Sequence, residues 1–356
     1  MSFGEMLRRT LSEWMKPDGP EADIALSSRI RLARNLPRIP FPRFAAKSQL
    51  EEVLNAVERV TAKSDVVGHL DFIRLGNLSP LERAVLVEKH LISPQHAEDP
   101  EYKAVALRNE EIISVMVNEE DHLRIQVLQP GLSLDKAWEL ANKVDDFYES
   151  ELDFAFSETR GYLTACPTNV GTGMRASAML HLPALVMTDQ MKRVIAASSQ
   201  IGLAVRGFYG EGTEAIGNMF QISNQVTLGH SEGEIIRHLT AAARQIIEQE
   251  RNARAALFHD VRLPLEDRIY RAYGLLSNAR NLTSEEAMRL LSDVRLGVDL
   301  GLIKEIGIPL LNELLVAIRP ASLQKLVGGS LTPEARDVQR AALIREKIRS
   351  TQQKTS

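Results

Sequence analysis

Three short apolar segments follow one another between residues 104 and 128, and their spacing restricts the folds open to this chain. Each is rich in β-branched and aliphatic side chains, which is typical of β-strands. The segments are Ala104–Leu107, Ile112–Val117 and Leu123–Leu128. The polar turns between them are far too short for the crossover helix that parallel strands need. We therefore predict an antiparallel sheet.

The rest of the first 254 residues extends this pattern to an α+β domain, an antiparallel sheet flanked by helices. Leu134–Leu152 has apolar residues at helical spacing, and Leu203–Phe208 and Gln221–Leu228 have the composition of strands. The residues up to Met15 predict a short amphipathic helix at the N-terminus.

Strand signals end near residue 255, and the remaining residues predict an all-α C-terminal domain. The helices expected there are Thr283–Leu291, with a capping box formed by Glu286, then Ile308–Ile318 and Pro333–Ile348. The polar tail, 350–356, is expected to be disordered. We therefore divide the chain into a catalytic domain, 1–254, and a helical domain, 255–356.

The composition excludes several classes of protein. The chain has one cysteine, Cys166, so an intramolecular disulfide and a cysteine-based zinc site are impossible, and we expect no metal site. The net charge of −4 argues against direct binding of nucleic acid or of a membrane surface. No apolar run has the length of a membrane span, and no secretory signal is recognisable. We expect a cytoplasmic protein.

Cys166 opens a glycine-containing stretch, CPTNVGTGMRAS, that is a poor helix and a poor strand. Gly171 and Gly173 allow positive φ angles and a close approach of the backbone to a ligand. A cysteine and Arg175 on such a loop can face one cleft. The alternative is a buried structural cysteine beside a surface loop.

Arginines are placed on strands and loops rather than on helix exteriors. In the extended segment SSRIR, the side chains of Ser27, Arg29 and Arg31 share one face. Arg124 shares a face with Gln126 in the same way. With Arg175 and Arg206, which ends an apolar run, these arginines suggest one polyanion site, because guanidinium groups bind phosphate oxygens in pairs. Scattered surface ion pairs are the alternative.

The segment Asn118–His122, NEEDH, places three carboxylates in the tight turn between two predicted strands. Adjacent carboxylates repel one another, so a turn that needs only polarity would not favour them. A solvated hairpin tip is the alternative. Another carboxylate, Glu211, lies between two glycines in RGFYGEG.

Five of these segments, in this order, resemble motifs of the phosphagen (guanidino) kinase family: SSRIR, EKHLISP, NEEDHLR, CPTNVGTGMRAS and RGFYGEG. The resemblance implies a catalytic domain built on an antiparallel sheet, in agreement with the strand pattern. It also implies ATP, with Mg²⁺, as phosphate donor. The positions that it assigns to nucleotide binding are Ser27, Ser28, Arg29, Ile30, Arg31, His90, Arg124, Arg175, Ala176, Ser177, Arg206 and Gly207.

The same resemblance assigns catalytic roles to three residues. Glu120 matches the catalytic glutamate, and we expect it to take a proton from the acceptor guanidinium, which is protonated and a poor nucleophile at neutral pH. Glu211 matches the glutamate that holds the guanidinium in arginine kinases. Cys166 matches the reactive cysteine, which contacts the guanidinium as a thiolate and forms no covalent intermediate.

Two departures from the small-molecule enzymes narrow the resemblance. SSRIR begins at residue 27, which leaves no room for the helical N-terminal domain that closes over a free guanidino substrate in that group. A helical domain also follows residue 255. Both features are similar to McsB-type protein arginine kinases, and this resemblance extends through SDVRLGVDLG and RDVQRA over essentially the whole chain. It implies ATP-dependent phosphorylation of arginine side chains in proteins.

The resemblance also implies regulation and partners. The RDVQRA residues Arg336, Asp337, Arg340 and Ala341 match a phosphoarginine pocket used in allosteric control. The implied partners are a heat-shock repressor and unfolded proteins as substrates, a Clp ATPase/protease, a zinc-binding activator protein and a second copy of the chain in a homodimer, in stress response and protein quality control. A free-arginine kinase and a phosphoarginine-binding adaptor without kinase activity are the alternative functions. A solvated helix face, with Asp337 paired to Arg340, is the alternative to the pocket.

Overall fold

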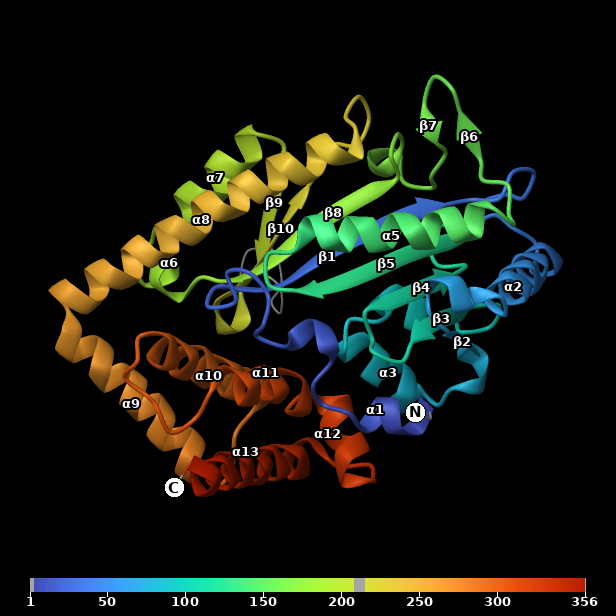
Figure 1. The fold of residues 1–356 in the computed structure, drawn as a ribbon. Coiled ribbons are helices and arrows are strands. Elements are labelled where there is room, and N and C mark those ends of the chain that lie inside the picture. The colour runs from blue at the N-terminus through green and yellow to red at the C-terminus, as the bar shows by residue number, and fades with distance from the viewer. Residues whose placement is uncertain (1–2, 208–214, 356) are drawn as a thin grey trace.

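The computed structural model describes residues 3–207 and 215–355, and its centre is an eight-stranded antiparallel sheet (Figure 1). The strand order is β2-β3-β4-β5-β1-β8-β10-β9. The strands are β1 (Ala25–Arg34), β2 (Leu70–Arg74), β3 (Ala104–Arg108), β4 (Ile113–Val117), β5 (Leu123–Pro130), β8 (Met174–His181), β9 (Leu203–Gly207) and β10 (Met219–Asn224). A separate hairpin pairs β6 (Phe156–Ser157) with β7 (Gly161–Tyr162). The predicted α+β class and the antiparallel pairing are confirmed.

The strand predictions differ from the structure at β2, where the sequence predicts no strand, at β8 and near β10. The expectation that CPTNVGTGMRAS is a poor strand is wrong for its last four residues, because Met174–Ser177 begin β8 in the middle of the sheet. The strand expected over Gln221–Leu228 begins earlier, at Met219, and ends at Asn224. The Asn224 side chain explains the end, because it accepts from the backbone N–H of Ala176 and donates to the Met174 carbonyl, which turns the chain away from β8. Phe208, the expected last residue of β9, lies outside the described residues.

The register gives the sheet two chemically different faces. Ile30 on β1 lies opposite Val127 on β5 and Ala176 on β8, and all three are buried. Arg31, the next residue, lies opposite Gln126 and Arg175. Because side chains alternate along a strand, one face is apolar and the other carries arginines. The second is called the arginine face below.

Helices cover the apolar face and form the main core with it, and in Figure 1 α5 crosses the sheet and α8 runs beside it. The helices of the first part are α2 (Lys47–Thr61), α3 (Pro80–Glu88), α4 (Pro94–Ala97), α5 (Leu134–Glu149), α6 (Pro183–Met187), α7 (Met191–Gln200) and α8 (Glu232–Asp260). The helix expected over Leu134–Leu152 is confirmed as α5, with its last turn ending at Glu149.

The C-terminal part is entirely helical within the described residues, as predicted. Its helices are α9 (Arg262–Asn278), α10 (Ser284–Asp299), α11 (Ile308–Ala317), α12 (Pro320–Val327) and α13 (Pro333–Thr355). Thr283 caps α10 by accepting from the Glu286 N–H, which is one of the two bonds of the predicted capping box. The helix continues beyond the expected Leu291. The prediction of a disordered tail is wrong up to Thr355, because α13 continues through it.

The short helix predicted at the N-terminus is present, but it does not extend to Met15. The helix α1 (Phe3–Arg8) ends early, and Arg9 then donates to the Asn109 carbonyl. A single 3₁₀ turn follows at Glu13–Met15, where Trp14 and Met15 are buried. They pack in a cluster that joins Leu26, Leu128 and Met179 of the sheet to the helical C-terminal part. The buried residues of α1 belong to another cluster, so apolar spacing here reflected two separate burial sites.

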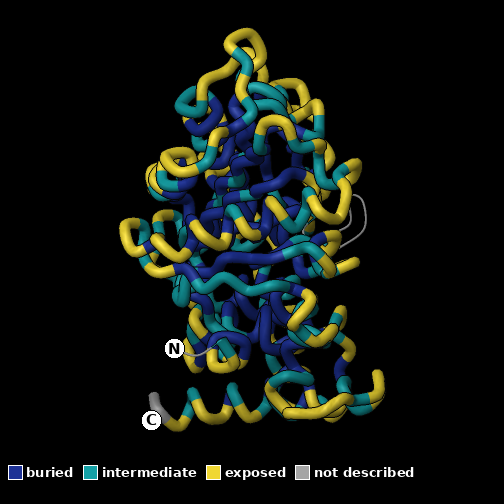
Figure 2. Tube along the Cα trace, turned by 90° about the vertical axis from the view of Figure 1, so that its right-hand side faces the viewer, coloured by how far each residue is buried: buried dark blue, intermediate teal, exposed yellow. Residues whose placement is uncertain are grey.

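Two parts of the chain are joined without a break by α8. The domain boundary expected after residue 254 falls inside this helix, and the division there stays a prediction. Figure 2 shows buried residues running through the sheet and into the helices below it. Among the described residues, no helix is long and apolar enough to cross a membrane.

Candidate active site

The predicted arginines gather on one face of the sheet. Arg29 on β1 lies opposite Ser177 on β8, and two residues further along Arg31 lies opposite Arg175. Arg206 on β9 lies opposite Gln221 on β10, whose other neighbour is Met179. In an antiparallel ladder, directly opposed residues point to the same face. The sheet therefore brings four arginines from three strands together.

These four arginines have no carboxylate partner among the described residues. None of the ion pairs found there includes Arg29, Arg31, Arg175 or Arg206. Arg29 instead donates to neutral oxygens, at 2.6 Å to Gln221 Oε1 and 3.4 Å to Ser177 Oγ. The Arg31 Nε atom is buried without a hydrogen-bond partner in the described structure. Three of the four are half-buried, and Arg206 is exposed. Like charges held close together without a counter-ion repel one another, so their clustering points to an anion that completes the site.

The mutual proximity of these cations is visible in their pKa values. Burial, and then the neighbouring Arg124 and Arg175, lower the pKa of Arg29 to about 10. Burial and the charges of Arg29, Arg124 and Arg175 lower the pKa of Arg31 well below its usual range. Arg29 remains protonated at neutral pH, and a bound polyanion would relieve the repulsion at both residues.

The acidic turn, Asn118–His122, connects β4 to β5, and its three carboxylates differ in burial and in hydrogen bonding. Glu119 is 5% exposed, accepts from Ser93 Oγ at 2.6 Å and pairs with Arg124 Nη1 at 2.7 Å. Asp121 is fully buried. Glu120 is 46% exposed and accepts from Arg124 Nη2 at 2.9 Å. The solvated hairpin tip is therefore wrong for two of the three, which are buried and bonded.

Glu120 faces a cavity of about 90 Å³ that also receives Cys166 and three arginines. Its lining residues are Arg31, Leu32, Ala33, Glu120, Arg124, Cys166, Asn169, Gly173 and Arg175. Burial raises the pKa of Glu120, with Asp121 and Glu119 adding to this and Arg124 opposing it. The structure thus places a carboxylate, a thiol and three guanidinium groups around one space.

The glycine loop is fixed to the acidic turn and to β1. Asp121 Oδ1 accepts at 2.7 Å from both the Ala165 N–H and Asn35 Nδ2. Gly173 has a φ of +65°, and a Cβ there would lie 2.5 Å from Arg34 Nη1 and 2.7 Å from the Ala33 carbonyl oxygen. The sequence needs glycine at this point for both reasons. Cys166 Sγ, half-buried, lies 3.1 Å from Thr168 Oγ1.

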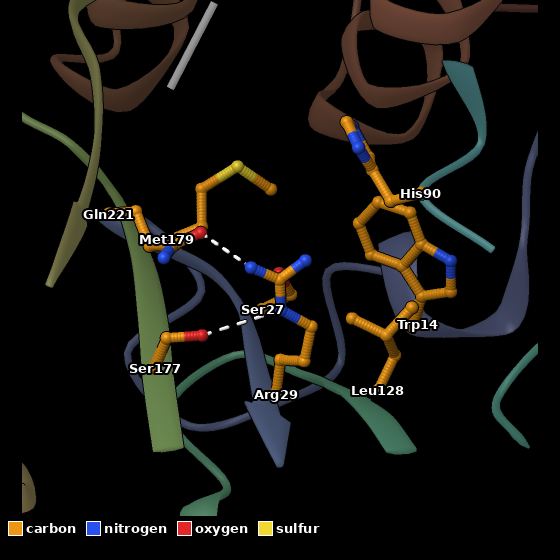
Figure 3. A pocket seen from close by; sticks show the side chains of 8 residues that line it. All are labelled: Trp14, Ser27, Arg29, His90, Leu128, Ser177, Met179 and Gln221. Atoms are coloured by element: carbon orange, nitrogen blue, oxygen red, sulfur yellow. Dashed lines mark hydrogen bonds between the residues drawn. The ribbon is translucent and has the colours of Figure 1, made fainter. Parts of the chain in front are cut away.

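His90 lies at the other end of the arginine face, in a narrow pocket with Ser27 and Arg29. It follows α3 with a φ of +60°, and its carbonyl accepts from Gln126 Nε2 at 2.8 Å. Burial, then Arg29 and Arg319, lower the pKa of His90 to about 3, so its ring is neutral at physiological pH. The full lining is Trp14, Ser27, Arg29, His90, Leu128, Ser177, Met179 and Gln221 (Figure 3).

Not every predicted site residue points toward these pockets. Ser28 bonds to the Gly131 carbonyl and accepts from the Ser133 N–H, whereas Ile30 and Ala176 are buried in the main core. All three alternate with the arginine-face residues. Gly207 ends β9 beside Arg206. Glu211 lies outside the described residues.

The RDVQRA residues lie in the first turns of α13, far along the chain from these pockets. Arg340 is 2% exposed and donates at 2.8 Å to the carbonyls of Ile318 and Leu282, and it pairs with Asp337. Arg336 is half-buried, and Ala341 is fully buried. The expected Asp337–Arg340 pair is present, but on a buried rather than a solvated face. The phosphoarginine pocket stays a prediction.

Sequence reasoning assigned no individual role to several residues that shape the site. Glu119 anchors Arg124, Asn35 orients Asp121, and Gln221 holds Arg29. Trp14 enters from the N-terminal segment. Of these, Gln221 could have been found, since it alternates with apolar residues on β10; Asn35 and Trp14 carry no local signal because their partners are distant in the chain.

Comparison with known proteins agrees with this architecture. The family model for the ATP:guanido phosphotransferase C-terminal catalytic domain matches residues 52–253, which defines the class of the protein as a guanidino phosphotransferase. The model for the McsB protein-arginine kinase C-terminal domain matches residues 262–356. A protein-arginine kinase of Brevibacillus brevis is 56% identical over 98% of both chains, and one of Bacillus subtilis is 53% identical over 98% of this chain and 96% of its own. The chain belongs to the protein-arginine kinase family and is an enzyme.

Solved structures show the same fold. The duplicated taurocyamine kinase from Schistosoma mansoni, with bound transition-state analogue components, has a TM-score of 0.61 and 26% identity. The match covers 66% of this chain and 34% of that one. A lombricine kinase has a TM-score of 0.60 at 22% identity, covering 70% of this chain and 71% of its own. The phosphagen-kinase fold expected from the sequence is confirmed.

Proposed function

We propose that the chain transfers the γ-phosphate of MgATP to arginine side chains of proteins at the cavity shared by Glu120, Cys166 and Arg175. The arginines without carboxylate partners carry this proposal, because four cations on one sheet face match the charge of a nucleoside triphosphate. Phosphoryl transfer depends mainly on positioning and on neutralising charge, which such a cradle supplies.

The acceptor guanidinium needs a base and a negative environment. Glu120 is partly exposed beside the cavity, so an incoming side chain can reach it, and its raised pKa makes it a stronger base than an ordinary glutamate. As the N–P bond forms and the bond from the γ-phosphorus to the bridging oxygen of the leaving ADP breaks, the guanidinium proton would pass to Glu120. Cys166 would contact the guanidinium as a thiolate, and Glu211 would hold its other side.

Mg²⁺ would arrive with the nucleotide. No group of three or more His, Cys, Asp or Glu side chains suited to a metal occurs within residues 3–207 and 215–355. Mg²⁺ commonly keeps several waters and binds through substrate phosphates, where it neutralises charge. We therefore treat MgATP as the substrate.

The family resemblance alone supports the finer parts of the proposal. We propose that arginine phosphorylation marks proteins for a Clp-type protease and inactivates a heat-shock repressor. A zinc-binding activator protein, a homodimer through the helical part and a phosphoarginine pocket at Arg336, Asp337, Arg340 and Ala341 would regulate the activity. Degradation of a phosphorylated and an unphosphorylated substrate by a purified Clp protease tests the marking directly.

The transfer itself is tested with ATP, Mg²⁺ and either an unfolded protein substrate or free arginine, read by mass spectrometry under conditions that spare acid-labile phosphate. Phosphate on protein arginines supports the proposal. Phosphate on free arginine alone would replace it with a free-arginine kinase. Transfer to neither acceptor, together with binding of phosphoarginine, would favour an adaptor.

A further inference from the structure

We propose that Thr227 positions the glycine loop and that its hydroxyl holds Cys166 and Asn169 at the cavity with Glu120. Cys166 and Asn169 line that cavity, whereas Thr227 is not among the described residues that do so. Its role is therefore to place other side chains rather than to touch a substrate. The proposal rests on the proposed function, since it takes this cavity as the place of transfer.

The Thr227 hydroxyl lies between two carbonyl groups of the glycine loop. Its Oγ1 atom is 2.9 Å from the Thr168 carbonyl oxygen and 2.7 Å from the Val170 carbonyl oxygen. A hydroxyl donates one hydrogen, so the two carbonyls share it. The two acceptors flank Asn169, and the Thr227 side chain is 3% exposed. One buried donor therefore fixes the backbone on both sides of a residue that lines the cavity.

The segment that carries Thr227 is itself fixed and lies directly against the loop. Asn224, the last residue of β10, donates to the Val226 carbonyl at 3.2 Å and is also bonded to β8, the neighbouring strand in Figure 1. Gly171 has a φ of +114°, and a Cβ there would lie 2.9 Å from the Thr227 carbonyl oxygen and 3.0 Å from Leu228 Cα. The two backbones therefore meet without space for a side chain, which brings the hydroxyl within reach of the loop.

Cys166 lies between two such attachments. Before it, the Ala165 N–H donates to Asp121 Oδ1 at 2.7 Å, so the acidic turn fixes the start of the loop. After it, the Asn169 N–H donates to the Cys166 carbonyl at 3.0 Å and closes a tight turn, whose far side Thr227 holds. Loss of the second attachment would leave the thiol tethered from one side only, so Cys166 and Asn169 would move together.

The competing explanation is that Thr227 contributes only to stability, as another buried hydroxyl would. Thr61 on α2 provides the comparison, because it is 1% exposed and its Oγ1 lies 2.8 Å from both the Val57 carbonyl oxygen and the Tyr148 hydroxyl. Val57 and Tyr148 belong to the main core. Thr61→Ala therefore removes a buried hydroxyl with two partners, as Thr227→Ala does, but not one that bonds to the glycine loop.

The first experiment measures transfer from MgATP to an unfolded protein substrate. For Thr227→Ala we expect kcat to fall about tenfold or more, with KM for ATP within about twofold, because a displacement of about 1 Å at a reacting group can cost about 10² in rate. Thr227→Ser keeps the hydroxyl and should retain kcat within about threefold, and Thr61→Ala should retain it fully. Equal losses of stability in Thr227→Ala and Thr61→Ala, with kcat unchanged in both, would overturn the proposal.

The second experiment follows the loop itself through the rate at which iodoacetamide alkylates the thiol. The chain has one cysteine, so the reaction reports on Cys166 alone. In Thr227→Ala we expect alkylation to be about two- to tenfold faster, as for a local opening that one hydrogen bond no longer restrains. Thr227→Ser and Thr61→Ala should react at the rate of the unaltered protein. An unchanged rate in folded Thr227→Ala would remove Thr227 as a positioning residue.

Thr227→Val is the second variant, used if Thr227→Ala does not fold. It fills the space of the side chain but places a methyl group where the hydroxyl lies, 2.7–2.9 Å from the two carbonyl oxygens, against about 3.3 Å for an ordinary C–H···O contact. The loop should be displaced, with the same fall in kcat and the same faster alkylation. If the unaltered protein transfers no phosphate, the proposed function fails, whereas the alkylation rates still decide whether Thr227 holds the loop.

Discussion

Arg31 on β1 and Arg175 on β8 lie directly opposite each other, so the antiparallel pair places two guanidinium groups side by side on one face of the sheet. Like charges in this position destabilise a sheet. Neither residue has a carboxylate partner within the described part of the chain, and so the fold carries this repulsion until an anion binds. Stability without nucleotide and affinity for nucleotide should therefore change in opposite directions when one charge is removed.

Arg31→Gln tests this relationship. We expect the free energy of unfolding without nucleotide to rise by about 0.5–1 kcal/mol, because the repulsion across the strand pair is lost. ATP affinity should fall by about tenfold or more, as for loss of a charge-assisted hydrogen bond. Urea unfolding and calorimetry measure the two quantities. Arg271→Gln, at an exposed ion pair with Asp267, should change neither by more than a few tenths of a kcal/mol.

Glu120→Gln should abolish transfer and leave ATP binding nearly intact. The amide keeps the size of the side chain but cannot accept the guanidinium proton, and general-base catalysis typically contributes about 10²–10⁴ in rate. Single-turnover transfer and a parallel binding titration separate the two effects. Transfer at more than about a tenth of the original rate would exclude Glu120 as the base.

The pH dependence of transfer should follow the ionisation of Glu120. Burial and the adjacent carboxylates Asp121 and Glu119 raise its pKa, so the acid limb of kcat/KM should lie above the usual glutamate range. The Glu119→Gln substitution removes one neighbouring negative charge. It also leaves Glu120 without a competing carboxylate for the ion pair with Arg124. Both changes lower the pKa of Glu120, so the limb should move to lower pH; a shift to higher pH would contradict this assignment.

Arg340→Ala should destabilise the helical part by about 3 kcal/mol, because a buried cation that holds two carbonyls and Asp337 is removed. Arg336→Ala should cost less than about 0.5 kcal/mol. Thermal and urea unfolding compare the two. Arg336→Ala is consequently the variant in which loss of phosphoarginine binding can be separated from loss of structure. Equal stability of both variants would show that Arg340 is free to serve a ligand.

Gly173→Ala should displace the glycine loop and lower transfer. The positive φ costs about 1 kcal/mol, and the added methyl group would meet Arg34 and the Ala33 carbonyl. Gly301 has a φ of +72°, but no atom lies within 4 Å of the place that an added methyl group would take, so Gly301→Ala isolates the cost of the backbone angle. We expect both variants to lose stability and only Gly173→Ala to lose transfer, measured by mass spectrometry.

Local pattern was sufficient for β3, β4, β5 and β9, for the antiparallel sheet and for the shared face of Arg29 and Arg31, because alternation along a strand fixes the side of the sheet without further information. It missed β2 and the start of β8, which lies in a glycine-containing stretch. It was also sufficient for the Thr283 cap. It could not show that β10 stops at Asn224, since that end depends on a side chain that bonds to β8, 50 residues earlier in the chain.

Long-range burial explains the remaining differences. Glu119 and Glu120 are adjacent and chemically identical in the sequence, yet one is buried against Ser93 and the other faces the cavity. The sequence pattern is compatible with Arg340 on the surface of an amphipathic helix. In the structure its side chain is buried and donates to the Ile318 carbonyl. Local propensity and spacing cannot identify these partners, because they are distant in the chain. Glu211 lies outside the described residues.

The contact between Asn312 and the Met15 carbonyl joins groups 297 residues apart, and Thr10 reaches Glu313 across 303. During synthesis the N-terminal segment leaves the ribosome first, whereas the helix that fastens it is made near the end of translation. The surroundings of Trp14 are therefore complete only after nearly the whole polypeptide has been synthesised. A chain released before α11 is made would lack both contacts, so premature termination would leave the segment around Trp14 without its fastening.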